Sequence, residues 1–382
     1  MLKKTEKKNK KVFVAMSGGV DSSVAALLLK KEGYDVVGVF MKNWGEPLGE
    51  GERCQWERDQ KDAREVAAVL KIPFYTFDFE KDYKKKVADY MLAEYKKGRT
   101  PNPDVMCNKE IKFGLFLGRA LKLGADFVAT GHYVKLKSKN EKGKIKIQLF
   151  QAKDKNKDQS YFLWTLTQKQ LKYCLFPIGD YLKPEVREIA KKAWLPTAEK
   201  KDSQGVCFVG KFDFAEFLKK KIKPKKGKII DIDSGEIIGE HDGVYYYTIG
   251  QRHGIGLKGG LEKGGENSPY FVCGKDIKKN ILYAAAGENN PALYKKEIKL
   301  LGVSFINPNH FSNSREWFLP VSARVRYRQP LQKASLFEIK NKKSNLKNFK
   351  VVFEKPQRAI APGQSAVFYL KSGETLGGGI IS

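Results

Sequence analysis

The chain has 382 residues, of which 41% are hydrophobic, and its 72 Lys and Arg against 43 Asp and Glu give a formal net charge of +29. These values exclude a disordered or fibrous protein and allow two or three domains with cores of their own. The positive charge favours a polyanionic partner, although a solvated, lysine-rich surface would give the same value.

The first predicted element is a strand, Val12 to Met16, which runs directly into the turn Ser17-Gly18-Gly19 and then a helix that ends near Lys31. This order suits a polyphosphate, because the glycines free backbone N–H groups and the helix start adds the positive end of its dipole. A Walker loop supplies a lysine to the β- and γ-phosphates, but this loop carries Asp21 and no lysine. It instead resembles the loop of the ATP pyrophosphatases, which cleave between the α- and β-phosphates. A plain Gly-Gly turn is the alternative.

Apolar strands and helical patterns then alternate, which predicts a parallel, doubly wound sheet with ligands beyond the carboxyl ends of its strands. The segments are Val36 to Met41, Asp59 to Leu70, Phe74 to Phe77, Asp82 to Lys96, Ile111 to Leu123 and Phe127 to Thr130. We expect the glycine-rich turn, Met41 and Gly131 to surround one nucleotide pocket. His132 could contact nucleotide or substrate there, or simply end a strand.

The segment from Arg99 to Asn108 contains two prolines and is predicted to be a loop, with a helix beginning after Lys109. Cys107 would then lie just before a helix N-terminus, where the dipole favours a thiolate. Asp104, three residues away, could move protons. Cys107 is therefore a candidate nucleophile, and a buried structural cysteine is the alternative.

We interpret the lysine-rich stretch Lys135 to Lys146 as a solvated hairpin tip, and we predict helical segments near Thr167 to Cys174 and Pro184 to Ala193. The first domain should close near residue 210. Cys207 follows in a polar, glycine-containing loop and is the second candidate sulfur. A nucleotide pocket with two such cysteines suggests an adenylated carbonyl that is attacked by sulfur.

Residues 211–290 look like a small α+β domain, with a helix at Phe214 to Lys220 and strands at Tyr245 to Ile249 and Tyr270 to Val272. Residues 291–382 look like a small β-barrel or sandwich. Its predicted strands are Ala323 to Tyr327, Ser335 to Ile339, Lys350 to Phe353 and Ala366 to Leu370. On the first of these, Arg324, Arg326 and Arg328 alternate and would face phosphate from one side, unless they only protect a solvated sheet edge.

The chain has an odd number of widely spaced cysteines and no Cys-x-x-Cys pair, which argues against a disulfide scaffold and a zinc ribbon. They are Cys54, Cys107, Cys174, Cys207 and Cys273. We predict a reducing compartment and no transition-metal site. The N-terminus is polar, and no segment approaches the ~20 apolar residues of a membrane span. The protein is therefore expected to be cytoplasmic and away from membranes.

Taken together, seven strings of residues resemble the tRNA-specific 2-thiouridylases from end to end. They are Met16-Ser17-Gly18-Gly19-Val20-Asp21-Ser22-Ser23, Gly98-Arg99-Thr100-Pro101-Asn102-Pro103-Asp104, Cys107-Asn108-Lys109, Ala129-Thr130-Gly131-His132-Tyr133, Lys157-Asp158-Gln159-Ser160-Tyr161-Phe162, Lys201-Asp202-Ser203-Gln204 and Thr248-Ile249-Gly250-Gln251-Arg252. The resemblance implies a Rossmann-like α/β domain with a PP-loop, a small α+β domain and a tRNA-binding β-barrel.

This resemblance also implies a mechanism. ATP, with Mg²⁺, would adenylate O2 of the wobble uridine, and a persulfide on Cys207, received from a donor protein, would deliver sulfur to C2. Cys107 would resolve the persulfide and form a transient disulfide with Cys207, while Asp104 acts as acid or base. The base would be flipped into its pocket, since C2 of a stacked base is poorly accessible.

The remaining implied contacts fall into three sets. The ATP contacts are Ala15, Met16, Ser17, Gly18, Gly19, Val20, Asp21, Ser22, Met41 and Gly131. Asn102 and Pro103 would line the base pocket. The tRNA contacts, in the anticodon stem-loop, are His132, Lys157, Asp158, Gln159, Arg326, Tyr327 and Gln364. DNA is not an expected partner.

Two other functions fit part of the sequence. A synthetase that joins ammonia or an amino acid to an adenylated small molecule would use the same loop without paired cysteines. A basic RNA-binding module could keep the nucleotide fold without catalysis.

Overall fold

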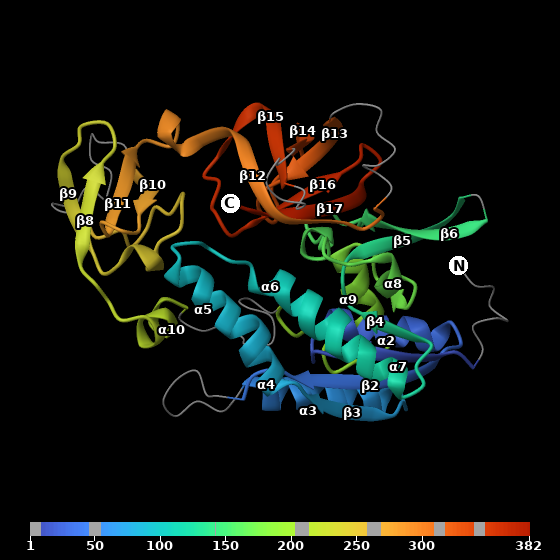
Figure 1. Cartoon of the computed structure of the whole chain (residues 1–382). Coiled ribbons are helices and arrows are strands. Elements are labelled where there is room, and N and C mark those ends of the chain that lie inside the picture. Colours follow the sequence, from blue (N-terminus) through green and yellow to red (C-terminus); the bar gives the residue numbers. More distant parts are fainter. Residues whose placement is uncertain are drawn as a thin grey trace.

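The structure is a computed structural model that describes residues 9–45, 55–141, 143–202, 214–257, 269–308, 318–339 and 348–382. It contains a five-stranded sheet, a four-stranded sheet and an eight-stranded sheet. Figure 1 shows the first of these with its helices in blue and green, the second in yellow and orange, and the third mainly in orange and red. No helix in the described part of the chain is both long and apolar enough to span a bilayer.

The first sheet has the order β3-β2-β1-β4-β7, and all of its pairings are parallel. Its strands are β1 (Lys11–Ala15), β2 (Asp35–Lys42), β3 (Phe74–Asp78), β4 (Phe127–Thr130) and β7 (Cys174–Leu175). The central strand β1 pairs Val12 with Val36 of β2 and with Phe127 of β4. The carboxyl ends of β1, β2 and β4 therefore meet at one edge, as the alternating pattern predicts.

Helices cover both faces of this sheet. One apolar core joins Val12 and Val14 to α2 (Val20–Lys31), α3 (Gln55–Val69) and α9 (Lys183–Lys192). The other joins Phe13 and Ala15 to two long helices that change locally to π-helical geometry. These are α4-η1-α5 (Glu80–Tyr83, Lys84–Ala88, Asp89–Lys96) and α6-η2-α7 (Pro103–Met106, Cys107–Phe116, Leu117–Lys122). The doubly wound α/β fold is confirmed.

The lysine-rich stretch after β4 is more than a solvated tip. It forms an antiparallel hairpin of β5 (Val134–Glu141) and β6 (Lys144–Gln151), whose inner end pairs with β17 (Glu374–Ile381). The hairpin therefore extends the sheet of the C-terminal barrel. Short helices follow at η3 (Ser160–Phe162) and α8 (Gln168–Leu171), and Cys174 lies in β7 instead of a helix.

The second sheet, order β10-β11-β8-β9, follows α10 (Phe214–Lys221). Its strands are β8 (Gly227–Asp231), β9 (Ile237–His241), β10 (Tyr270–Asp276) and β11 (Ile281–Ala286). The predicted strand at Tyr245 to Ile249 is wrong. Val244–Tyr246 form a 3-10 turn, η4, and Tyr246 and Ile249 pack onto the small core around Ile229 and Leu282.

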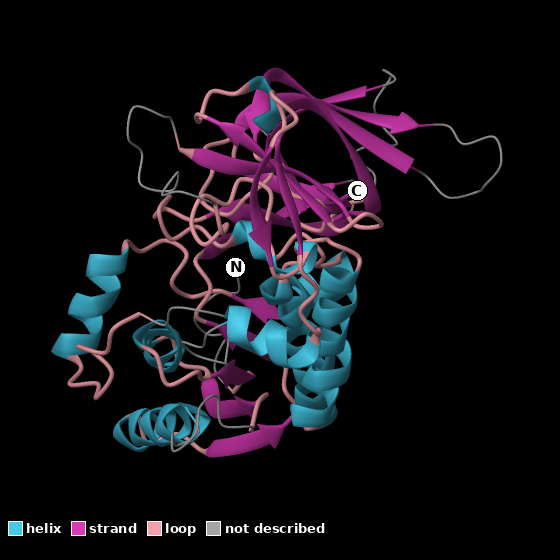
Figure 2. Ribbon diagram, turned by 90° about the vertical axis from the view of Figure 1, so that its left-hand side faces the viewer, coloured by secondary structure: helices cyan, strands magenta, loops and turns pink. Residues whose placement is uncertain are grey.

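After a 3-10 turn, η6 (Pro291–Leu293), six antiparallel strands close into a barrel through the pairing of β12 with β17. They are β12 (Tyr294–Phe305), β13 (Phe318–Arg324), β14 (Gln332–Ile339), β15 (Asn348–Arg358), β16 (Ser365–Tyr369) and β17. Figure 2 shows this barrel stacked against the helical end of the first domain. The predicted C-terminal barrel is confirmed.

The predicted strand Ala323 to Tyr327 ends early, and this removes the proposed row of arginines. β13 stops at Arg324, whose side chain is buried, whereas Arg326 and Arg328 are exposed in the turn that follows. Arg328 has a φ of +64°, which a strand does not allow. The three guanidinium groups therefore do not share one strand face.

Candidate functional site

The glycine-rich turn leads from the end of β1 into the first turn of α2, as predicted. Ser22 Oγ accepts a hydrogen bond from the Ser17 amide at 3.1 Å and donates one to the Gly19 carbonyl at 3.1 Å. Ser23 Oγ donates to the same carbonyl at 2.9 Å. These bonds fix the loop from both sides, so that its backbone amides are pre-oriented for an anion at the helix start.

Two glycines in this region have backbone close to a neighbouring segment. Gly18 has a φ of +72°, and a Cβ there would lie 2.2 Å from the Asp59 carbonyl oxygen of α3. A Cβ on Gly131, in the loop after β4, would lie 2.6 Å from the Ser22 nitrogen. Both loops therefore meet at the first turn of α2, where the sequence predicted a nucleotide pocket.

Met41, the last residue but one of β2, lies at the same edge and is buried, as is Met16. His132 is also buried, with its Nδ1 2.7 Å from Thr130 Oγ1 and its ring against Phe113 and Phe176. Burial, and secondarily the charge of Lys112, holds the His132 pKa well below its usual value. The imidazole is therefore neutral, and it can act as a hydrogen-bonding group but not as a cation.

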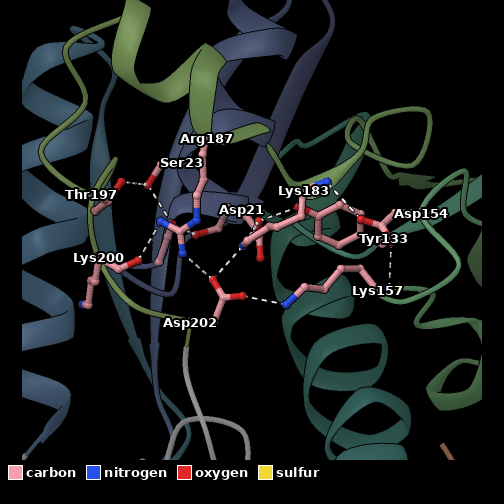
Figure 3. A network of polar contacts seen from close by, with 12 residues as sticks. Asp21, Ser23, Tyr133, Asp154, Lys157, Lys183, Arg187, Thr197, Lys200 and Asp202 are labelled. Atoms are coloured by element: carbon pink, nitrogen blue, oxygen red, sulfur yellow. Dashed lines mark hydrogen bonds and ion pairs between the residues drawn. The ribbon is translucent and has the colours of Figure 1, made fainter. Parts of the chain in front are cut away.

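A network of charges lies directly over the phosphate loop (Figure 3). Asp21 Oδ1 accepts hydrogen bonds from Tyr133 Oη at 2.8 Å and from Lys183 Nζ at 2.7 Å. Lys183 also lies 2.9 Å from Asp202 Oδ1. Lys183 is not predicted from the sequence, because nothing in its local pattern indicates that the start of α9 meets the phosphate loop.

Asp202 holds two further cations, with Arg187 Nη2 at 2.7 Å and Lys157 Nζ at 2.6 Å. Partial burial raises the pKa of this carboxyl, but the hydrogen bonds and charges of Lys157 and Lys183 outweigh burial and lower the pKa to about 2. Asp202 is thus ionised throughout the physiological range. Lys157, predicted as a tRNA contact, lies beside the phosphate loop as well.

The segment predicted as a loop up to Asn108 is already helical from Pro103. Asn102 is the N-cap, its Oδ1 accepting from the Val105 amide at 3.2 Å, and Pro103 occupies the first turn. An Asn-Pro pair is the signal that could have located this start. Cys107 therefore lies within the helix, beyond the first turn where the dipole acts most strongly.

The residues of the site predicted around Cys107 differ in how deeply they are buried. Cys107 is fully buried in the core that contains Met41 and Ile111, whereas Asn102, Pro103 and Asp104 are half-buried. The three latter residues can line a surface pocket as they stand. Cys107 can attack a sulfur only after its surroundings rearrange. Cys207, the second predicted sulfur, and Cys54 lie outside the described residues.

The loop before Asn102 is held by residues of the other two domains. Gln364 Nε2, after β15, donates to the carbonyls of Thr100 at 2.8 Å and Pro101 at 3.2 Å. Lys275 Nζ of β10 donates to the Gly98 carbonyl at 3.1 Å, and Thr248 Oγ1 lies 3.2 Å from Thr100 Oγ1. Gln364, predicted as a tRNA contact, therefore positions the Asn102 loop.

The other predicted tRNA contacts differ in exposure. The Asp158 carboxylate is buried and binds Arg324 Nη2 at 3.1 Å together with Gln151, Ala152 and Ser160. Gln159 Oε1 accepts from the Tyr133 amide at 3.0 Å. Tyr327 is half-buried against Phe162, with ring centroids 4.5 Å apart, and Arg326 is exposed. Arg326 and Tyr327 are thus the members of this set best placed to touch a large ligand.

Among the described residues, no group of three or more His, Cys, Asp and Glu side chains could hold a metal ion. The described cysteines Cys107, Cys174 and Cys273 form no disulfide. Burial raises the pKa of Cys174 far above its usual value and that of Cys273 to about 11. Neither is a ready nucleophile.

Three family models cover nearly the whole chain. They are described as a tRNA methyl transferase HUP domain over residues 10–211, a tRNA methyl transferase PRC-barrel domain over 215–286 and an aminomethyltransferase beta-barrel domain over 298–381. Their order matches the three sheets described above.

The relatives are similar over the same length. A tRNA-specific 2-thiouridylase MnmA of Streptococcus thermophilus is 50% identical, covering 99% of this chain and 96% of the relative. Those of Streptococcus mutans and Bacillus licheniformis are each 49% identical, covering 99% and 97% of this chain and 96% and 94% of the relatives. The chain therefore belongs to the tRNA-specific 2-thiouridylase family.

Proposed function

We propose that this protein uses ATP to replace O2 of the wobble uridine in tRNA with sulfur. The observation that carries the proposal is a lysine-free phosphate loop, at the carboxyl edge of a parallel sheet, in a chain similar over its whole length to proteins named as 2-thiouridylases. That loop suits α,β-cleavage of ATP, which leaves AMP on an oxygen and makes it a leaving group.

The chemistry follows in three steps. Uridine O2 attacks the α-phosphorus of ATP, and pyrophosphate leaves with the electron pair of the broken P–O bond. The terminal sulfur of a Cys207 persulfide then attacks C2. The Cys107 thiolate attacks the Cys207 sulfur, which breaks the persulfide S–S bond, forms a Cys107–Cys207 disulfide and leaves one sulfur on C2 as AMP departs. An external thiol must reduce the disulfide before the next cycle.

The residues have distinct roles in this proposal. The backbone from Ala15 to Ser22 binds the phosphates, and Met41 and Gly131 contact adenosine. Asn102 and Pro103 line the base pocket, Asp104 moves the proton, and Lys157, Gln159, Arg326 and Tyr327 face the tRNA. His132, which is buried, contacts the tRNA only after its surroundings rearrange. Asp158 and Gln364 act by positioning their neighbours. Because Cys107 is buried, we propose that tRNA binding exposes it.

Several partners complete the proposal. Mg²⁺ arrives with ATP, since nucleotide-bound Mg²⁺ takes most of its ligands from phosphate and water and needs only one or two carboxylates. Asp21 is the carboxylate at the phosphate loop that could supply one. The persulfide comes from a separate sulfur-donor protein, and the reaction takes place in the cytoplasm. We assign ATP to residues 1–210 and place the tRNA across all three domains, with residues 211–290 as the small central domain and 291–382 as a tRNA-binding barrel.

The test combines purified protein, unmodified tRNA, ATP, Mg²⁺ and a persulfide donor, with mass spectrometry of the nucleosides. We expect 2-thiouridine from the wild type, none from Cys107→Ser or Cys207→Ser, and tRNA-dependent release of pyrophosphate from all three. Cys273→Ser, at a half-buried free thiol, is the matched control and should retain wild-type yield. AMP joined to a small acceptor would favour the synthetase, and binding without AMP would favour an RNA-binding module.

A further inference from the structure

The phosphate loop itself carries no cation, yet a reaction that releases pyrophosphate must stabilise several negative charges. The described cation that touches this loop is Lys183, whose Nζ lies 2.7 Å from Asp21 Oδ1. Its side chain is only 10% exposed, so its ammonium group is shielded from bulk water on most sides. Such shielding strengthens its attraction for an anion.

Lys183 belongs to a compact group of three cations around one carboxylate, as Figure 3 shows. Asp202 accepts from Lys157 Nζ and Arg187 Nη2 and pairs with Lys183. With Asp21 and Asp154 included, three positive charges face three negative ones. Displacing Asp202 would leave the cations in excess.

The cations are fixed by neighbours other than Asp202. Asp154 Oδ2 accepts from the Lys183 amide at 3.0 Å, which anchors the start of α9. Arg187 Nη1 donates to the carbonyls of Ala198 at 2.9 Å and Lys200 at 3.0 Å. Asp202 itself is about one-third exposed, at 34%. A phosphate could take its place without moving the backbone that holds the cations.

We propose that Lys183 and Arg187 bind the pyrophosphate end of ATP, and that Asp202 is a counter-ion that the phosphates displace. This inference rests on the proposed function and adds the group that stabilises its leaving group. As the bond between the α-phosphorus and the bridging oxygen breaks, its electron pair moves onto pyrophosphate. The ammonium and guanidinium groups then lie beside the oxygens on which charge develops.

The test is direct binding of magnesium pyrophosphate to the full-length protein by titration calorimetry. Lys183→Met should weaken binding about 10- to 100-fold, the range expected for losing a hydrogen bond to a charged group. Lys183→Arg should recover most of the affinity. Asp202→Asn should bind pyrophosphate more tightly than the wild type, because it removes a competing negative charge. Lys191→Met, an exposed lysine on the same helix, should be unchanged.

Lys183→Met and Asp202→Asn are expected to change the affinity for pyrophosphate in opposite directions, and this distinguishes ligand binding from a structural role. Unchanged affinity in Lys183→Met, or weaker affinity in Asp202→Asn, overturns the inference. AMP affinity should be equal in the wild type and Lys183→Met, because AMP carries no pyrophosphate; an equal loss for both ligands also overturns it. The proposed function fails separately, if the wild type makes no 2-thiouridine while pyrophosphate binding still follows this pattern.

Discussion

At the scale of single residues, Gly131 lets the loop after β4 lie close to the first turn of α2, because it has no side chain. We predict that Gly131→Ala lowers the free energy of unfolding by about 1–3 kcal/mol, as expected of an overpacked position. Its Cβ would be 2.6 Å from backbone of α2, so the phosphate loop must shift and KM for ATP should rise. Urea denaturation and AMP-formation kinetics measure both effects.

Gly118 provides the matched control for that substitution. It is an exposed residue in α7 with nothing within 4 Å of its Cβ position. Alanine has the higher helix propensity, so Gly118→Ala should be neutral or stabilising by up to ~1 kcal/mol. Equal stability of both variants and the wild type would mean that the contact between Gly131 and Ser22 is easily relaxed.

Lys275 predicts a pH dependence. Burial lowers its pKa from 10.5 to about 8, so between pH 8 and 10.5 the unfolded chain binds a proton that the folded chain has lost. Stability rises with pH wherever the unfolded state holds more protons. The wild type should therefore gain up to about 2 kcal/mol over Lys275→Met between pH 7 and 9.5.

Urea denaturation of the wild type and Lys275→Met at the two pH values isolates the contribution of Lys275 to stability, because the two proteins share all other titrating groups. Lys278→Met, which removes a neighbouring lysine beyond the end of β10, is the matched control for the loss of one positive charge. A constant difference between wild type and Lys275→Met would contradict the lowered pKa.

At the scale of elements, the stability of the helix that begins after Asn102 can be separated from the proposed contact of Asn102 with the uridine. Asn102→Ala should cost about 1 kcal/mol, because the Val105 amide loses its cap. Asn102→Asp should keep the cap, since a carboxylate accepts the same bond. If the Asn102 amide contacts the uridine, thiolation should fall in both variants while stability falls only in the first. Full activity of Asn102→Asp would place the base elsewhere.

The elements that the sequence predicted are those with strong local patterns. The alternation from Val12 to Thr130 predicted the parallel sheet, and the Gly18-Gly19 turn lies where expected. The pattern misplaces the start of the helix at Pro103, because prolines are common both in loops and in the first turn of a helix. No local pattern revealed that the hairpin up to Gln151 would pair with β17, more than two hundred residues later.

The same limit applies to the charges over the phosphate loop. The motif identifies Asp21, whereas the positions of Lys183 and Arg187 depend on the packing of α9 beside α2. Pairwise contacts between distant segments depend on the topology. The exposure of Arg326 against the burial of Arg324 likewise depends on where β13 ends.

At the scale of the whole molecule, the barrel and the first domain are joined by polar groups as well as apolar ones. Tyr161 and Trp164 pack with Val367 and Tyr369 across this junction, and Tyr161 Oη donates to the Ser365 carbonyl at 2.9 Å. The junction also supports the loop that precedes Asn102, through Gln364. A change that loosens it should therefore affect the predicted base pocket from a distance.

The buried pair Asp158–Arg324 tests that view. Arg324→Met should destabilise the protein by about 3 kcal/mol, because it leaves the Asp158 charge buried without its cation. The double variant Asp158→Asn/Arg324→Met removes both charges and should recover much of the loss, measured by urea denaturation. If Asp158 instead contacts tRNA directly, Asp158→Asn would raise KM for tRNA at unchanged stability. Asp158 is only 1% exposed, which favours a structural role. In that case thiolation falls because the Asn102 loop is displaced.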